Sequence, residues 1–433
     1  MVEKCLVSLA HPLRIQGSVV EAHLPKTQIG EICEIQKSLV ETEILGYAQV
    51  IGFTRTQTFL SLFTDNRGFS RENIIIPTGK PFRINVDDTL AGAIMDATGT
   101  LRGRLDEAPL QTQSGSTSVD TVQPPRDFTH RKPINEPLIT GVRAIDGLLT
   151  CGVGQRIGIF AAAGCGKTSL MRMIVEQSEA NIYVIGLVGE RGREVTEFVK
   201  ELRASPRRNR IILIYATSDS SSVERCNAAQ IATTVAEYFS NQGKSVLLFI
   251  DSITRYARAL RDVALSMGEM PARRGYPASV FDALPKLLER PGCFITGSIT
   301  AFYTVLIEDE EELDVIGDEV RSILDGHIYL SRKLAAQGHY PAIDIMQSIS
   351  RVFSEVTDIA HQQLAGQFRK DWSTQQSMQL YLDLGEYRRG ENSENDAALD
   401  RKSAMQLFLK QELMERSNKR TCLEKLYECL AEK

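Results

Sequence analysis

The sequence predicts an α/β fold with a mostly parallel sheet, preceded by a small β-barrel domain and followed by a helical domain. Three observations predict it. From Leu138 onward, short and almost wholly apolar strands alternate with helical stretches, as in a parallel sheet buried on both faces. The first 79 residues instead carry short β-branched runs separated by turn residues. From about Glu355 the chain becomes helical in pattern and mixed in charge.

The N-terminal region, from Ile15 to about Thr78, is interrupted by Gly, Pro or Asn about every eight to twelve residues. This spacing predicts a small closed or sandwich β-domain with a structural role. A domain that binds single-stranded nucleic acid would need exposed aromatic residues among Lys and Arg. The phenylalanines here lack that pattern, and we interpret them as mostly core residues: Phe53, Phe59, Phe63 and Phe69.

A polar stretch rich in Ser, Thr and Pro, residues 111–133, is predicted to be an exposed connector. The predicted domains are therefore a β-barrel at 1–79, a central domain at 80–354 that includes the connector, and a helical domain at 355–433. In the helical domain, apolar residues recur at amphipathic spacing: Met405, Phe408, Leu409, Leu413, Leu426 and Leu430. Packing against the central domain is the favoured interpretation, and a partner-binding stripe is the alternative.

The central strand candidates are RIGIF, NIYVIGLVG, RIILIYATS, SVLLFID, CFITGSIT and GHIYL. The first runs into AAAGCGKT and then into a helix that begins near Thr168, which is the layout of a P-loop. Backbone N–H groups of Gly164, Cys165 and Gly166 would bind phosphate at the helix N-terminus. Lys167 would reach the β- and γ-phosphates, and the Thr168 hydroxyl would ligate Mg²⁺.

The P-loop departs from the usual pattern at its first position, where Ala161 replaces glycine and restricts the turn. Ser169 completes the predicted nucleotide-binding set, and Cys165 is interpreted as a small space-filling residue rather than a catalytic thiol. A glycine-rich turn that only caps a buried helix is the alternative. The strand, the lysine and the threonine in register favour the P-loop.

Two carboxylates follow other buried strands. Asp251 ends SVLLFID about 80 residues after Lys167, where it could hold Mg²⁺ through its water shell or cap the next helix. Glu190 follows NIYVIGLVG and could orient the attacking water, because ligands bind at this edge of α/β sheets. Arg191 could bind γ-phosphate oxygens. On spacing alone, a surface salt-bridge cluster of Glu190, Arg191, Arg193 and Glu194 is an equal alternative.

The composition is that of a soluble globular protein, because 42% of the 433 residues are hydrophobic and 24% are charged. A net charge of −5 argues against a large nucleic-acid-binding surface. The eight cysteines include no CxxC pair, which indicates neither a zinc site nor a disulfide framework and favours a reducing cytoplasm. No apolar run approaches the roughly 18 residues of a spanning helix. The apolar run near the N-terminus is too brief for a signal peptide.

Five segments together resemble the type III secretion system ATPases, close relatives of the flagellar export ATPase and more distant relatives of the catalytic subunits of rotary ATP synthases. They are AAAGCGKT, GLVGERGREV, LLFIDSITRYARALRDVA, PARRGYPASVFDALPKLLER and DGHIYLSRKLAAQGHYPAIDIMQSISRVF. The resemblance spans essentially the whole chain. It implies a RecA-like P-loop core that uses ATP and Mg²⁺. It also implies a secretion function: dissociating chaperone–effector complexes and promoting the unfolding and export of secreted proteins.

The resemblance assigns roles to the P-loop and carboxylate residues. Lys167 and Thr168 match the P-loop pair, and Asp251 matches the Walker B aspartate. Glu190 matches the catalytic glutamate, and Arg191 falls at the arginine beside it.

Two further residues are assigned by resemblance alone. Arg351, in SISRVF, matches an arginine finger that reaches the nucleotide of the neighbouring subunit. Tyr340, in GHYPAID, matches an aromatic residue that stacks near adenine. Because one chain carries both a catalytic glutamate and a finger, identical sites could form around a homohexamer.

The resemblance also implies partner surfaces. The acidic run in LIEDEEELDVIGDEV (Glu308 to Glu312, Asp314, Asp318 and Glu319) matches a region facing a central channel, although a solvated loop is the ordinary interpretation. Residues 384–395 match a helix–loop–helix stretch that contacts stalk or cargo. The implied partners are a central stalk protein, a peripheral stator or regulator, and chaperone–effector complexes bound by the C-terminal domain. The implied location is the cytoplasmic face of the bacterial inner membrane, without nucleic acid.

Three alternative functions are considered. A flagellar export ATPase shares every motif. A nucleic-acid ring translocase shares the P-loop core, but the acidic loop and the net charge of −5 disfavour it. A nucleotide-binding subunit without turnover would lack the carboxylate found at Glu190.

Overall fold

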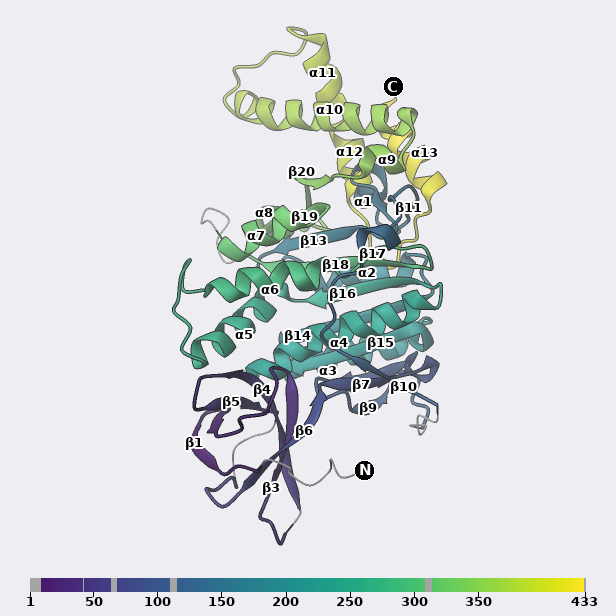
Figure 1. Cartoon of the computed structure of the whole chain (residues 1–433). Coiled ribbons are helices and arrows are strands. Elements are labelled where there is room, and N and C mark those ends of the chain that lie inside the picture. Colours follow the sequence, from purple (N-terminus) through teal and green to yellow (C-terminus); the bar gives the residue numbers. More distant parts are fainter. Residues whose placement is uncertain (1–8, 42, 64–67, 110–114, 308–313, 432–433) are drawn as a thin grey trace. The chain divides into compact units, whose positions relative to one another are not determined.

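The computed structural model of the 433-residue chain describes residues 9–41, 43–63, 68–109, 115–307 and 314–431. Figure 1 shows the path of the chain through its helices and strands. The contacts of the chain divide it into two compact units. The first contains residues 1–125, 184–238 and 250–290, and the second contains residues 126–183, 239–249 and 291–433. Among the described residues, no helix is both long enough and apolar enough to cross a membrane.

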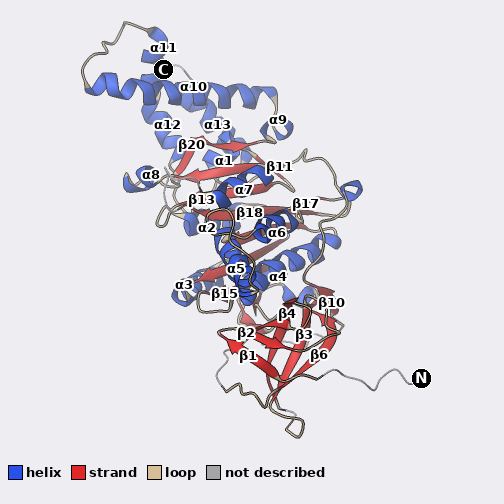
Figure 2. Ribbon diagram, turned by 60° about the vertical axis from the view of Figure 1, so that its left-hand side comes forward, coloured by secondary structure: helices blue, strands red, loops and turns tan. Residues whose placement is uncertain are grey.

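Six antiparallel strands form the N-terminal β-barrel of the first unit (Figure 2). In chain order they are β1 (Pro12–Gln16), β2 (Val19–Ala22), β3 (Glu31–Gln36), β4 (Ile44–Phe53), β5 (Thr58–Leu62) and β6 (Ile74–Pro81), and their order in the sheet is β1-β2-β5-β4-β3-β6. Ala10, just before β1, exchanges backbone hydrogen bonds of 3.2 and 2.8 Å with Ile75 on β6. This bridge joins the two edge strands, so the predicted barrel is confirmed.

Alternate side chains of these strands face the barrel interior because strand side chains have a period of two. The interior residues are Val20, Ala22, Leu24, Cys33, Ile35, Ala48, Val50, Leu60, Leu62 and Ile75. Of the phenylalanines predicted to be core, Phe63 is buried, and Phe59 and Phe69 are half-buried. The prediction is wrong for Phe53, which is 59% exposed because it lies at the hairpin end of β4.

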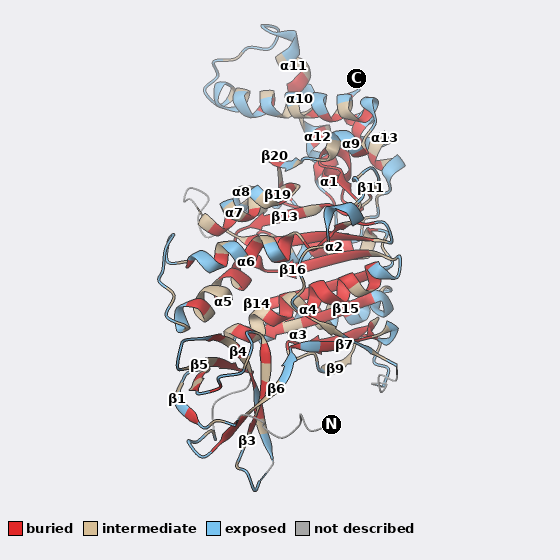
Figure 3. Cartoon of the chain, viewed as in Figure 1, coloured by how far each residue is buried: buried red, intermediate tan, exposed pale blue. Residues whose placement is uncertain are grey.

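The first unit also carries strands of the large sheet, in the order β14 (Ile182–Glu190, of which residues 184–190 lie in this unit), β15 (Ile211–Thr217), β8 (Ala93–Asp96) and β9 (Leu101–Arg104). β15 and β8 are parallel, and β9 forms an antiparallel edge. Every residue of β14 is buried, as expected for a strand covered on both faces (Figure 3). The helices of this unit are α3 (Gly192–Ala204), α4 (Ser222–Asn241), α5 (Ile253–Ser266) and α6 (Ala278–Leu288), with short 3₁₀ turns at Asp88–Leu90 and Arg208–Arg210.

The prediction of an exposed connector at 111–133 is wrong for part of its length. Within it, β10 (Thr117–Asp120) pairs antiparallel with β7 (Arg83–Val86), and Thr121 is fully buried. The Thr121 carbonyl accepts a hydrogen bond of 2.9 Å from buried Arg290, whose guanidinium also pairs with Glu237 at 2.6 Å. A buried guanidinium needs acceptors for its N–H groups. The polar segment around Thr121 is therefore buried because it supplies an acceptor to Arg290, which is far away in the sequence.

The second unit carries other strands of the large sheet, in the order β20 (Ile343–Ser350), β19 (Gly326–Leu330), β13 (Arg156–Ala161), β18 (Ser298–Leu306) and β16 (Ser245–Asp251). The last two residues of β16, Ile250 and Asp251, belong to the first unit. β13 is parallel to both β18 and β19, whereas β20 is antiparallel to β19. A short pair, β11 (Pro137–Leu138) and β12 (Cys151–Gly152), forms a separate ribbon. This mostly parallel arrangement confirms the predicted α/β class.

The segment CFITGSIT was predicted as one strand but forms a tight turn between β17 (Gly292–Cys293) and β18. The Phe294 N–H donates to the Gly297 carbonyl at 2.8 Å and closes the turn. A Cβ atom at Gly297 would lie 2.3 Å from the Ser240 carbonyl oxygen. Glycine is therefore needed here for a close backbone approach, which an apolar pattern does not reveal.

The remaining helices belong to the second unit: α1 (Arg143–Leu148), α2 (Lys167–Gln177), α7 (Val315–Ile323), α8 (Arg332–Ala336), α9 (Phe353–Val356), α10 (Ile359–Asp383), α11 (Ser393–Asp400), α12 (Lys402–Leu409) and α13 (Lys419–Leu430), with a 3₁₀ turn at Phe128–His130. α10, α12 and α13 pack on α1. The predicted apolar stripe is buried at Met405, Phe408, Leu409, Leu426 and Leu430. Leu413 is half-buried in a non-helical segment between α12 and α13.

Candidate active site

The predicted P-loop lies in the second unit, between β13 and α2. Gly164 and Gly166 adopt φ values of +81° and +86°, which L side chains rarely adopt. Gly166 is the N-cap residue of α2, so the loop delivers its backbone N–H groups to the positive end of an 11-residue helix. Ala161 is the last residue of β13, paired with Leu306 and Leu330, and a strand residue does not need glycine. The departure at this position therefore leaves the loop intact.

The three residues that open α2 are Lys167, Thr168 and Ser169. Lys167 is half-buried, whereas Thr168 and Ser169 are exposed. No heavy atom lies within 4 Å of the position that a Cβ atom on Gly164 would occupy, so the loop is open on that side. A helix N-terminus, two left-handed glycines, a lysine and an exposed hydroxyl fit the triphosphate of ATP and a bound Mg²⁺.

Tyr340 lies beside this loop. A Cβ atom at Gly166 would lie 3.4 Å from Cε1 of the Tyr340 ring, so the ring packs against the backbone of the P-loop. The tyrosine is 45% exposed, which leaves part of its aromatic surface available for stacking. The structure thus brings Tyr340 together with the P-loop, although it lies 174 positions after Gly166 in the sequence.

Cys165 is 2% exposed, which supports its interpretation as a space-filling residue. We expect maleimide to modify it more slowly than the half-buried Cys293, and we expect ATP to slow the reaction further. Completed modification should abolish ATPase activity because the adduct would occupy the phosphate-binding loop. Peptide mass spectrometry paired with residual activity measures both effects, with Cys165→Ala as the control. Full activity after complete modification at Cys165 would contradict the expectation.

Arg351 directly follows β20, also in the second unit. Its backbone N–H donates to the Asp325 carbonyl at 2.9 Å, and its Nη2 donates to the Arg321 carbonyl at 3.3 Å. Arg321 lies in the last turn of α7, so the guanidinium is held at the negative end of a helix. The residue as a whole is exposed.

Glu190 lies in the first unit as the last residue of β14 and is 6% exposed. Its carboxylate pairs with Nη1 of Arg255 at 2.7 Å, and the same Nη1 donates to the Gly189 carbonyl. Arg255 comes from α5 and was not singled out from the sequence. Its position in the first turn of a helix after a buried strand, in SITRYARAL, is the only signal that the sequence offered.

Arg191 and Arg193, unlike Glu190, have exposed side chains. The Arg191 side chain is 79% exposed and pairs with Glu194 at 3.4 Å, and Arg193 pairs with Glu197 at 2.9 Å. These are ordinary surface pairs along the exposed side of α3. The surface salt-bridge cluster predicted as the alternative is therefore only partly present. Arg191 and Arg193 form surface pairs along α3, whereas Glu190 is buried and pairs with Arg255.

Asp251 ends β16 and is 3% exposed. The next helix, α5, is capped by Ser252, whose hydroxyl accepts from the Arg255 N–H at 3.3 Å. The capping role considered for Asp251 therefore belongs to Ser252.

The predicted partner segments are described in part. Residues 308–313 of the acidic run lie outside the described residues. Asp314 caps α7, Asp318 is exposed and pairs with Arg321 at 2.7 Å, and Glu319 is half-buried. Residues 384–395 connect α10 to α11 and extend into the first turn of α11.

Comparison with known proteins identifies the family. The profile of the ATP synthase alpha/beta family, nucleotide-binding domain, matches residues 141–350, and that of the T3SS EscN ATPase C-terminal domain matches residues 357–428. The SPI-1 type 3 secretion system ATPase of Salmonella typhi is 56% identical over 417 residues, which are 96% of this chain and 96% of the relative. The chain belongs to the type III secretion system ATPases.

Two solved structures are similar to this ATPase along nearly its whole length. One is the assembled ATPase EscN from the type III secretion system of enteropathogenic E. coli, with a TM-score of 0.89 and 42% identity. The other is assembled EscN in complex with its central stalk EscO, with a TM-score of 0.87 and 42% identity. In both cases the match covers 98% of the present chain and 100% of the EscN chain. The predicted RecA-like architecture and ATP hydrolysis are confirmed by this membership.

Proposed function

We propose that this ATPase is the ATP-hydrolysing ring of a bacterial type III secretion apparatus, where it dissociates chaperone–effector complexes and promotes the unfolding and export of secreted proteins. The observation that carries the proposal is the 56% identity to an ATPase of such a system across 96% of both chains. The proposed domains are the barrel at 1–79, the nucleotide-binding domain at 80–354 and the cargo-binding domain at 355–433. The C-terminal profile match at residues 357–428 supports the last of these.

The proposed P-loop chemistry uses the opening of α2. The N–H groups of Gly164, Cys165 and Gly166 bind the phosphates, and Lys167 neutralises charge on the β- and γ-phosphates. When bound, Mg²⁺ withdraws charge from the triphosphate. Residues that would hold it are Thr168, through its hydroxyl, and Asp251, through the water shell of the ion. Ser169 contributes to the binding of the phosphates.

The proposed general base is Glu190, which orients the attacking water and accepts its proton. Its ion pair with Arg255 supports this role, because a carboxylate held by a guanidinium keeps one orientation. Arg191 is proposed to approach the γ-phosphate only after its exposed side chain leaves Glu194, a pair that contributes little stability.

Arg351 is proposed to act in trans, as the finger for the site of a neighbouring copy in a homohexamer. Its exposure is consistent with a role at a subunit boundary. The assembled form of the relative EscN supports a ring. Tyr340 is proposed to stack on the adenine.

The proposed partners are a central stalk protein, a peripheral stator or regulator, and chaperone–effector complexes, with the ring at the cytoplasmic face of the inner membrane and without nucleic acid. The complex of EscN with its central stalk supports the first of these. The acidic residues of the 308–319 region are proposed to attract a basic stalk.

The test of composite sites is the ATPase rate per subunit as a function of protein concentration, with mass measured by light scattering in the same samples. We expect this rate to rise by at least about tenfold as oligomers form, because the finger is supplied in trans. Lys167→Ala, which should assemble without turnover, serves as the control for contaminating ATPases. A monomer that hydrolyses ATP as fast as the assembled form would contradict the proposal.

A further inference from the structure

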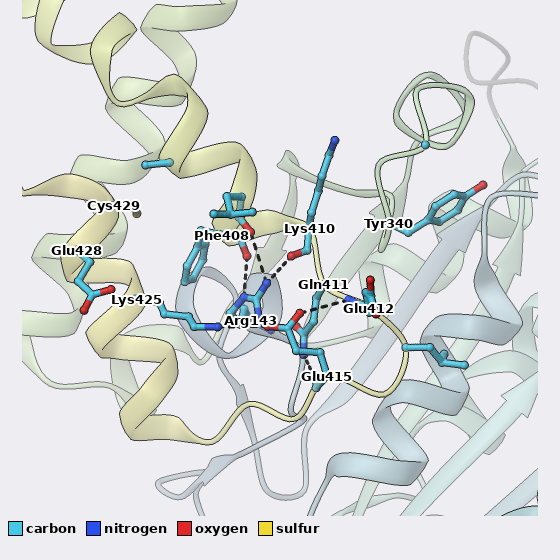
Figure 4. Close-up of a pocket in the computed structure, with 14 residues that line it drawn as sticks. Arg143, Tyr340, Phe408, Lys410, Gln411, Glu412, Glu415, Lys425, Glu428 and Cys429 are labelled. Atoms are coloured by element: carbon cyan, nitrogen blue, oxygen red, sulfur yellow. Dashed lines mark hydrogen bonds and ion pairs between the residues drawn. The ribbon is translucent and has the colours of Figure 1, made fainter.

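A short segment of the second unit connects the C-terminal helices to the elements that carry Tyr340 and the P-loop. It consists of residues 410–415, between α12 and α13, and is called the strap here. Its second residue is Gln411, which is 5% exposed. A cavity of about 940 Å³ is lined by the strap, by α12 and α13, and by Tyr340 (Figure 4).

The side-chain amide of Gln411 uses its acceptor and both of its donors. Oε1 accepts from the Arg143 N–H at 2.8 Å, and Nε2 donates to the Gly141 carbonyl at 2.7 Å and to the Glu415 carbonyl at 2.8 Å. Glutamate could accept but could not donate when ionised, and leucine could do neither. The position therefore requires a neutral amide of this length.

Arg143, from α1, holds the strap from the other side. Its side chain is 4% exposed and donates to the carbonyls of Phe408, Leu407 and Lys410, the first at 2.9 Å, and it pairs with Glu415. Lys425 on α13 approaches Glu415 at 3.2 Å. Burial acts to raise the pKa of Glu415, but hydrogen bonds from Arg143 and Lys425 outweigh it and hold that pKa below its usual value. The strap is thus bound to α1 and α13 by ionic and hydrogen-bonded contacts.

The strap also contacts the two elements that form the nucleotide site in this unit. The Gln411 N–H donates to the Tyr340 carbonyl at 2.9 Å. Gln177, the last residue of α2, donates to the Leu413 carbonyl at 3.3 Å. The strap therefore connects Tyr340, which packs beside Gly166, to α2, the helix that follows the P-loop.

We propose that Gln411 is a positioning residue for the nucleotide base. By fixing the strap, it fixes the Tyr340 backbone and so the distance between the tyrosine ring and Gly166. This inference rests on the proposed stacking of Tyr340 on adenine. Because Gln411 acts through the tyrosine that stacks on the base, it governs nucleotide affinity rather than the hydrolytic step.

The test uses the full-length protein and the variant Gln411→Leu. We expect the Kd of a fluorescent ATP analogue and the KM for ATP to rise about tenfold, with kcat at saturating ATP within about twofold of wild type. Inhibition by inorganic tripolyphosphate, which has no base, should be unchanged. The matched control is Gln375→Leu, since Gln375 is 4% exposed and donates to the Ala398 carbonyl at 2.6 Å within the same group of helices. This control should leave KM unchanged.

A double-mutant cycle with Tyr340→Ala separates the inference from the function on which it rests. If Gln411 acts through Tyr340, the double variant should have the KM of Tyr340→Ala alone. The inference would be overturned if the KM increases of the two single variants multiplied in the double variant. It would also be overturned if Gln411→Leu weakened the binding of tripolyphosphate as much as that of ATP. Neither result would contradict the stacking of Tyr340. An unchanged KM in Tyr340→Ala would instead refute the stacking.

A second variant keeps the test decisive if Gln411→Leu does not fold. Gln411→Glu retains the acceptor for the Arg143 N–H and loses both donors when ionised. Its KM should rise as pH increases through the titration of the new carboxyl group, relative to wild type at each pH. A KM ratio that stays at one across that range in a folded Gln411→Glu would count against the positioning role.

Discussion

Replacing Glu190 with glutamine should lower kcat by about 10³-fold while ATP still binds, because general-base catalysis contributes roughly 10² to 10⁴ in rate. The amide has nearly the same shape, but it cannot accept the proton of the attacking water. It also loses the charge in the 2.7 Å pair with Arg255, which retains its hydrogen bond to the Gly189 carbonyl. We therefore expect the structure near β14 to persist.

The measurement for Glu190→Gln combines phosphate release at saturating ATP with the Kd of a fluorescent ATP analogue. Glu194→Gln is the matched control, since it removes a carboxylate four residues away that pairs only at the surface with Arg191. This control should retain nearly full turnover. Turnover within about threefold of wild type in Glu190→Gln would exclude the general-base role.

Replacing Arg351 with alanine should reduce turnover by about 10³-fold or more while leaving nucleotide affinity within about threefold, as expected when an arginine finger is removed. The guanidinium is exposed and is held by one hydrogen bond to the Arg321 carbonyl, so its loss leaves no buried group without a partner. The effect should therefore appear in kcat rather than in stability. Thermal unfolding and kcat, measured on the same preparation, separate the two.

Mixing two inactive variants tests whether Arg351 acts in trans. When Arg351→Ala and Glu190→Gln subunits assemble together, some boundaries join an intact Glu190 to an intact Arg351. In random equal mixtures about a quarter of the boundaries are of this kind, so about a quarter of wild-type activity should return. Arg420→Ala, which removes an arginine that pairs with Glu424 at the surface, should behave as wild type. A mixed assembly that stays inactive would show that the finger does not act between subunits.

Short-range features of the chain were predictable because their physics is local. A helix N-terminus with glycines at the phosphate-binding turn requires particular residues at fixed spacing, and AAAGCGKT carries them. Buried parallel strands such as β13, which pairs with β18 and β19, appear in the sequence as continuous apolar runs. The barrel strands, too, are marked by turn residues between β-branched runs.

The errors and omissions share a different cause. β10 and Thr121 enter the interior because Arg290, 169 residues further along, needs acceptors. The turn at Gly297 depends on a close approach to Ser240. Arg255 matters because it pairs with Glu190, and Gln411 matters because it contacts Tyr340 and Arg143. The residues next to them in the sequence do not indicate those partners.

The sequence by itself determined the fold class, the family and the chemistry of the P-loop, since each depends on residue types at short and regular spacing. Only the tertiary structure decided which buried charges are paired, which polar stretch is drawn into the interior and which amide joins the C-terminal helices to Tyr340. Those outcomes depend on satisfying hydrogen-bonding groups in a low-dielectric interior, and the partners that satisfy them come from distant parts of the chain.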